Sequence, residues 1–124
     1  MVIVTVTYPT SPASRFDFDY YRSRHIPLIW SLFRDYGLMD ARFIRGVAIP
    51  GGGPIAYHLV ALLSFSSADA FGRGGARHGD EIGADIANFT NVTPILQINE
   101  EFGAPEPGHT PQARPSKSDD PAGV

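Results

Sequence analysis

The most informative stretch for the fold is AYHLVALLSF at Ala56–Phe65, which is apolar for nearly its whole length. A short apolar run of this kind, bounded by turn-forming residues, predicts a β-strand. Alternation gives the strand two apolar faces: Tyr57, Leu59, Ala61, Leu63 and Phe65 point one way, and Val60 and Leu62 point the other. Both faces of the sheet that contains this strand therefore need a covering layer.

Three further strands are predicted around this one. Residues 40–49 contain ARFIRGVAI, and PGGGP at 50–54 predicts a hairpin connection into the strand at 56–65. A β-branched run predicts a strand at Val2–Tyr8. The last strand is predicted over 92–99, VTPILQIN, where Pro94 removes a ladder donor and so indicates an edge position or the first residues of the strand.

The first helix is predicted to begin near Phe18, because Asp17 can cap it. Its inward face is a set of residues that recur at intervals of three and four, namely Phe18, Tyr21, His25, Leu28 or Ile29, and Leu32. Pro27 lacks an N–H group, so it predicts a kink or a restart of the helix. Gly37 is a natural place for the helix to end.

A second helical region follows Ser66 or Ser67, either of which can cap it. Its middle, GRGGARHG, is poor helix material, since each glycine costs about 1 kcal/mol relative to alanine. We therefore predict two shorter helices with a break near Gly79. The second piece carries an apolar stripe of Ile82, Ile86 and Phe89.

The resulting order, βαββαβ, predicts an α+β fold of the ferredoxin-like type, with a four-stranded antiparallel sheet and both helices on one face. Two helices cover one face only, so we expect a homodimer in which the second faces pack together in a dimeric α/β barrel. The domain is predicted to span residues 1–102. Residues 103–124, rich in proline, glycine and polar residues, are predicted to form a flexible tail.

Composition narrows the classes of partner and site. The 124-residue chain has a formal net charge of -3 with scattered basic residues, which argues against nucleic acid. It has no cysteine, and its histidines lack the spacing of a helical zinc site, so we expect no metal site and no cofactor. Neither a signal peptide nor an apolar run of about 20 residues is present, and we expect a cytoplasmic protein that does not enter the membrane.

His25 is the candidate catalytic residue, because imidazole exchanges protons near neutral pH and apolar neighbours favour its neutral form. The competing interpretation is a core histidine that is hydrogen-bonded to a carbonyl or a carboxylate. The candidate substrate-binding residues are Tyr21, Trp30, Tyr57, Asn88 and Phe89. Trp30 is more typical of a core than of a cavity wall, and Asp85, Asn88 and Thr90 are more typical of caps and turns than of catalysis.

Two motifs in this chain resemble signatures of the EthD family, which belongs to the dimeric α/β-barrel superfamily. The first is a tyrosine pair followed by histidine, any residue, proline and leucine, matched by Tyr20, Tyr21, His25, Pro27 and Leu28. The second is matched by Asp85, Ile86, Asn88, Phe89 and Thr90. The resemblance covers Val2 to about Glu100, and the departure from it is GRGGARHG, where relatives typically have ordinary helix.

This resemblance implies an open cavity between sheet and helices. The family was named for a protein needed in ethyl tert-butyl ether degradation alongside a cytochrome P450 system, and the wider superfamily includes cofactor-free monooxygenases, lactone isomerases and polyketide cyclases. We therefore expect a cofactor-independent enzyme, foremost a monooxygenase-like oxidoreductase, that acts on a hydrophobic aromatic or cyclic compound with His25 as proton acceptor. An isomerase or decarboxylase, a non-enzymatic ligand-binding or accessory protein of an oxygenase system, and a purely structural dimer module are the alternatives.

Overall fold

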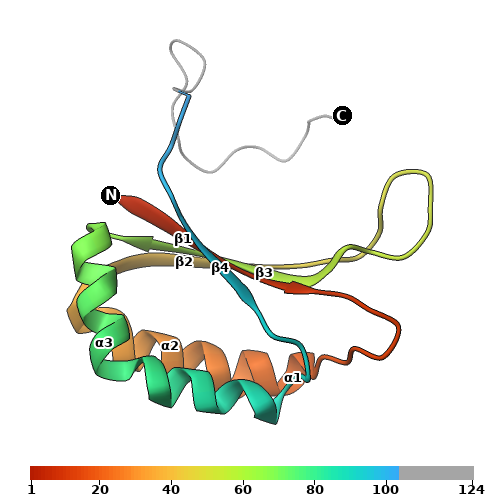
Figure 1. Ribbon diagram of the computed structural model, residues 1–124, viewed down its shortest axis with the longest axis horizontal. Coiled ribbons are helices and arrows are strands. Elements are labelled where there is room, and N and C mark those ends of the chain that lie inside the picture. The colour runs from red at the N-terminus through yellow and green to blue at the C-terminus, as the bar shows by residue number, and fades with distance from the viewer. Residues whose placement is uncertain (104–124) are drawn as a thin grey trace.

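A four-stranded antiparallel sheet forms one layer of the molecule and helices form the other (Figure 1). The computed structural model describes residues 1–103, so nearly all of the predicted tail lies outside the described residues. The strands are β1 (Val2–Pro9), β2 (Leu38–Arg45), β3 (Tyr57–Phe65) and β4 (Ile95–Asn99), in the spatial order β2-β3-β1-β4. The predicted α+β, ferredoxin-like fold is confirmed.

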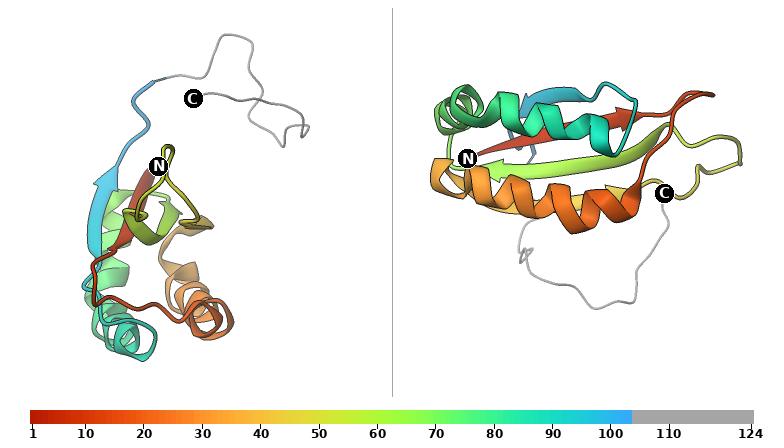
Figure 2. Two further views of the ribbon diagram at one scale, coloured as in Figure 1. Left: turned by 90° about the vertical axis from the view of Figure 1, so that its right-hand side faces the viewer. Right: turned by 90° about the horizontal axis from the view of Figure 1, so that it is seen from below.

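Two helical segments run side by side along the same face of this sheet (Figure 2). The first comprises α1 (Phe18–Tyr20), a π-helical turn η1 (Tyr21–His25), α2 (Ile26–Phe33) and a 3-10 turn η2 (Arg34–Tyr36). The second comprises α3 (Ala68–Asp85) and a 3-10 turn η3 (Ile86–Asn88). Within residues 1–103, no helix is long and apolar enough to cross a bilayer.

The first segment starts and restarts where its sequence predicts. The Asp17 side chain accepts a hydrogen bond from the Tyr20 N–H at 3.0 Å, which caps α1. Pro27 lies in the first turn of α2, and the π-helical turn directly precedes it, so the hydrogen-bond pattern of the helix changes just before the proline. The segment ends at Gly37, whose φ of 85° suits glycine.

The π-helical turn aligns the buried side chains of this segment, which are Tyr21, His25, Ile29 and Phe33. These positions are four residues apart, more than the 3.6 residues of an α-helical turn. The wider turn at Tyr21–His25 takes up part of that difference, so Tyr21 and His25 both face the sheet. Phe33, rather than the predicted Leu32, completes the buried face.

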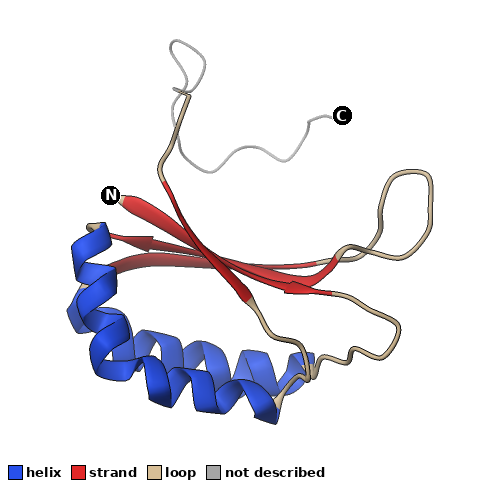
Figure 3. Cartoon of the chain, viewed as in Figure 1, coloured by secondary structure: helices blue, strands red, loops and turns tan. Residues whose placement is uncertain are grey.

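The predicted break near Gly79 is wrong, because α3 continues without interruption from its Ser67 cap (Figure 3). Gly74 is buried against the first helical segment. A Cβ atom on this residue would lie 2.8 Å from Cδ1 of Phe33 and 2.9 Å from Cβ of Tyr36. This glycine therefore lets the two helices approach closely. The stabilisation from that packing is not included in helix propensity.

A β-bulge changes the predicted alternation at the start of β3. Tyr8 pairs with Leu59 while Pro9 pairs with Tyr57, so His58 is an extra residue on that strand. Tyr57 consequently lines a surface hollow together with Ile44 of β2 and residues of the 46–56 hairpin loop. The prediction that its side chain shares the direction of Leu59 is wrong. β2 also ends at Arg45 rather than Ile49, because the chain leaves the sheet into this long loop.

The far face of the sheet has no helix over it in the part of the chain that the structure describes (Figure 1). By register it carries apolar residues, Ile3, Ile44, Val60, Leu62 and Ile95, among polar ones such as Thr5, Thr7 and Arg42. Ile44 is 53% exposed and Ile95 is 56% exposed. The composition of this face is what the predicted dimer requires, and the dimer itself stays a prediction.

Candidate functional site

A cavity of about 90 Å³ lies between the sheet and the helices. It is lined by Val6, Tyr8, Tyr21, His25, Ile29, Phe33, Ala61, Leu63, Phe65, Phe71, Ile82, Ile86, Pro94 and Leu96. Only three of these side chains carry polar atoms, namely the imidazole of His25 and the hydroxyls of two tyrosines. The site is therefore a predominantly apolar hollow with a few polar groups, which is typical of small-molecule sites.

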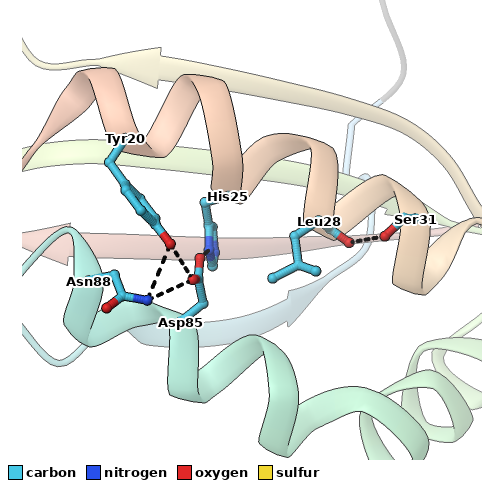
Figure 4. A network of polar contacts seen from close by, with 6 residues as sticks. All are labelled: Tyr20, His25, Leu28, Ser31, Asp85 and Asn88. Atoms are coloured by element: carbon cyan, nitrogen blue, oxygen red, sulfur yellow. Dashed lines mark hydrogen bonds and ion pairs between the residues drawn. The ribbon is translucent and has the colours of Figure 1, made fainter.

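His25 is joined to a carboxylate on the opposite helix. Its Nδ1 atom lies 2.8 Å from Oδ2 of Asp85, the last residue of α3, and the imidazole is only 3% exposed (Figure 4). A carboxylate can only accept, so Nδ1 carries the proton and donates it. The other ring nitrogen, Nε2, is thereby left with its lone pair available as a base.

The carboxylate is itself held by two more donors. The Tyr20 hydroxyl donates to Oδ1 of Asp85 at 2.6 Å, and the Asn88 side-chain amide donates to the same oxygen at 3.0 Å. Burial alone would raise the pKa of Asp85, but hydrogen bonds from Tyr20, His25 and Asn88 outweigh it and hold the pKa below its ordinary value. Asp85 therefore stays ionised and keeps the imidazole in one orientation.

Burial has the opposite consequence for His25. It lowers the pKa of the imidazole, and the bond and charge of Asp85 only partly oppose this shift. The ring of Phe89 lies 4.6 Å away and that of Tyr21 lies 5.1 Å away, centroid to centroid, and both exclude water. His25 is consequently a neutral base at pH 7.

The end of α3 also clamps the start of the first helical segment. The Asp17 N–H donates to the Phe89 carbonyl at 2.7 Å, and the Thr90 hydroxyl donates to the Arg15 carbonyl at 2.6 Å. These two bonds fix the distance between the helical segment that carries His25 and the helical segment that carries Asp85. Thr90 therefore acts as a structural tie, as its residue type suggested.

The predicted site residues fall into three groups. Tyr21 and His25 line the cavity, Phe89 packs against His25 from outside it, and Asn88 belongs to the polar network of Asp85. Trp30 instead lines a surface hollow with Ile26 and Arg34. Tyr57 lies on the other side of the sheet, as described above.

The residue type of Asp85 is typical of a cap, and nothing in the sequence pattern alone pairs it with His25. The two residues are 60 positions apart, and only the antiparallel approach of the helices brings them together. The available signal was its position in the second EthD-like motif, three residues before Asn88. Among residues 1–103, no group of three or more histidine or acidic side chains has the arrangement of a metal site.

The fold and this site define a class: a ferredoxin-like domain with a buried His–Asp pair beside an apolar cavity. No protein-family model matches the chain. An uncharacterized 11.0 kDa protein in the thcB-thcC intergenic region of Rhodococcus erythropolis is 34% identical over 105 residues, which cover 82% of this chain and 95% of that protein.

Two solved structures are also similar. An EthD-like protein from Ralstonia eutropha JMP134 is 34% identical, with a TM-score of 0.74, covering 80% of this chain and 89% of that one. A protein of the ethyl tert-butyl ether degradation (EthD) family from Bacillus halodurans C-125 shares the fold at 24% identity, with a TM-score of 0.65, covering 82% of this chain and 99% of that one. The chain belongs to the EthD-like family.

Proposed function

We propose that this protein is a small-molecule enzyme in which Nε2 of His25 removes a proton from a carbon atom next to a carbonyl group. The observation that carries this proposal is the His25–Asp85 pair, which presents a neutral, oriented base to an apolar cavity. Positioned general bases accelerate such steps by about 10²–10⁴-fold. The cavity favours an uncharged, hydrophobic substrate, because no cationic or anionic side chain lines it.

Oxygenation is the outcome that we place first. After the proton moves to Nε2, the C–H electron pair remains on the substrate as an enolate. In a monooxygenase without a cofactor, this enolate reduces dioxygen itself, so that a CH₂ group and O₂ yield a C=O group and one water. Isomerisation and decarboxylation are the alternatives, and isomerisation begins with the same loss of a proton.

The shared first step gives the test. Cyclohexanone, acetophenone and 1-indanone are incubated with the protein in D₂O, and deuterium entry next to the carbonyl is followed by NMR, with oxygen consumption measured in parallel. We expect exchange above the buffer rate for at least one ketone, and a loss of at least about 100-fold with His25→Ala. Exchange at the buffer rate for all three ketones contradicts the proposal.

A ligand-binding or accessory protein is the second candidate, favoured by the almost wholly apolar lining of the cavity. In that case His25 only holds a ligand. A ketone that raises the melting temperature without exchanging deuterium or consuming oxygen would support this function over the enzymatic one.

We also propose that two chains pair through the far face of the sheet, since Ile44 and Ile95 are exposed there. Light scattering at micromolar concentration should give the mass of a dimer. Leu62→Lys, in the middle of that face, should give a monomer, whereas Ala84→Lys on the exposed side of α3 should not change the mass. A monomeric wild-type protein contradicts the pairing.

A further inference from the structure

Two tyrosines border the same cavity as His25. Tyr8 comes from β1 and is 1% exposed, and Tyr21 comes from the π-helical turn and is 2% exposed. Their ring centroids are 6.1 Å apart in an edge-to-face arrangement, and the Tyr21 ring lies 5.1 Å from the imidazole. The two phenols and the base are thus neighbours around one hollow.

Neither phenol hydroxyl has a hydrogen-bond partner among residues 1–103. Yet neither oxygen is sealed from all free space, since Nδ1 of His78 is the one side-chain polar atom in the described chain that is both sealed and unpartnered. Both tyrosines line the same cavity, so this hollow is the free space beside them. Buried hydroxyls are normally paired, so two unpaired ones on side chains that line one hollow indicate a missing acceptor.

The charge state of the two groups defines the kind of acceptor. Burial raises the pKa of Tyr8, and it raises that of Tyr21 with a further contribution from the neighbouring Tyr8. Both hydroxyls therefore remain protonated at neutral pH. They can donate to an oxygen that gains negative charge, and they cannot act as bases.

We propose that the hydroxyls of Tyr8 and Tyr21 together hold the carbonyl oxygen of the substrate while His25 removes a proton from the adjacent carbon. This inference rests on the proposed function and specifies it. As the C–H bond breaks, its electron pair forms the C=C bond of the enolate and the carbonyl π electrons move onto the oxygen. The two hydrogen bonds strengthen at that moment, which is how paired donors stabilise such a transition state.

The dimensions of the hollow limit the substrate further. At about 90 Å³ it is smaller than a cavity of about 150 Å³ known to hold benzene, so only the reacting end of a larger compound fits inside. The wall formed by Leu96 is open to solvent, since this residue is 55% exposed. The substrate class is therefore an uncharged enolisable ketone or ester whose apolar remainder extends past Leu96 of β4.

Infrared spectroscopy tests the oxygen contacts without any need for turnover. Carbonyl-¹³C cyclohexanone bound to the wild-type protein should show a C=O band at lower frequency than in water-free solvent, since two donors weaken the bond. Tyr8→Phe and Tyr21→Phe should each remove part of that shift, and the double variant should remove it. Tyr36→Phe, whose hydroxyl lies outside the cavity lining, is the matched control and should retain it.

Further measurements separate this inference from the proposed function. Each cavity variant should slow deuterium exchange about 100-fold, mainly through kcat, while its melting temperature stays equal or rises because an unpaired buried hydroxyl has been removed. His25→Gln should lose exchange but keep the lowered C=O band. A full wild-type shift in the double variant, or no lowered band in the wild type, overturns the inference. A lowered band without exchange in the wild type overturns only the role of His25.

Discussion

The same two helical segments contact each other in different ways at the two ends of the helix layer. At one end, where η1 faces η3, His25 meets Asp85 through a 2.8 Å hydrogen bond, and Tyr20 and Asn88 complete a polar network (Figure 4). At the other end, where α2 faces the first half of α3, Gly74 lies against Phe33 without any polar link. We call these the polar end and the glycine end.

Each end also contains one histidine, and the two histidines differ in their partners. His25 has a carboxylate partner on Nδ1 and is one of the residues that line the cavity. His78 packs against the rings of Phe33 and Tyr36, its Nδ1 is sealed without a hydrogen bond, and the nearest carboxylate oxygen, of Glu81, is 3.8 Å away. Burial alone therefore does not distinguish the two histidines. The oriented imidazole that lines a cavity does, and for this reason we propose His25 as the base.

The largest effect expected from this comparison comes from removing the Asp85 charge at the polar end. Asp85→Asn keeps the shape but removes the charge that orients and supports the His25 imidazole, so we expect deuterium exchange to fall about 10- to 100-fold. Asp85 raises the pKa of His25 against the effect of burial. The acid limb of the pH–rate profile should therefore move to lower pH in this variant, which a merely structural role would not produce.

The glycine end supplies the control for that experiment. Glu81→Gln changes the same type of charge near the other histidine, on the same helix, and should leave both the rate and the pH profile unchanged. If the two variants lose activity equally, or if Asp85→Asn keeps the wild-type profile, the polar end has no special role and the comparison fails.

The sequence predicted where the first helical segment starts and ends better than it predicted how the two helical segments pack together. The Asp17 cap, the restart at Pro27 and the stop at Gly37 follow from local chemistry, and the structure contains all three. The predicted helix break near Gly79 is wrong. Helix propensity includes the cost of each glycine but not the close packing that Gly74 permits. That packing is a tertiary contact, which helix propensity does not include.

The candidate site shows the same limit more sharply. Tyr21 and His25 follow from the helical repeat, since both lie on one face of one segment. The partner Asp85 and the second phenol, Tyr8, come from a different helix and from a strand, so only the folded arrangement brings them to His25. Tyr57 was placed incorrectly because one bulge residue, His58, reverses the alternation that the prediction assumed.

An intermediate effect is expected from overfilling the glycine end. Gly74→Ala places a methyl group within 3 Å of Phe33 and Tyr36 and should lower the free energy of unfolding by about 1–2 kcal/mol, net of the gain in helix propensity. Gly75→Ala is the matched control, since its Cβ would meet no atom within 4 Å. That variant should be more stable than wild type by about 0.5–1 kcal/mol.

Urea denaturation measures both glycine variants under the same conditions. Opposite signs for two adjacent alanine substitutions would confirm that contact with α2, rather than helix propensity, keeps glycine at position 74. Equal stabilisation by both would mean that the helices separate easily, and the glycine end would then have no more packing constraint than the rest of α3.

The smallest expected effect is a dependence of stability on pH that originates at the polar end. The pKa of His25 is lower in the folded protein than its ordinary value of about 6.5, so the unfolded chain binds the proton more readily. The stability from the neutral imidazole is thus fully present above about pH 6.5 and is lost as pH falls toward the folded pKa. Asp85, whose pKa is also lowered, adds a loss in the same direction only at more acidic pH.

Urea denaturation of wild type and His25→Gln between pH 7.5 and 5 separates the contribution of His25 to the free energy of unfolding from that of the other titrating groups. The wild-type free energy of unfolding should decrease with falling pH through this window, and the variant should decrease less because glutamine does not titrate. His78→Gln, at the glycine end, is the control for losing a partly buried histidine as such. Parallel curves for wild type and His25→Gln would show that the imidazole is as easily protonated in the folded protein as in the unfolded chain, and would remove the physical basis for a neutral base in this cavity.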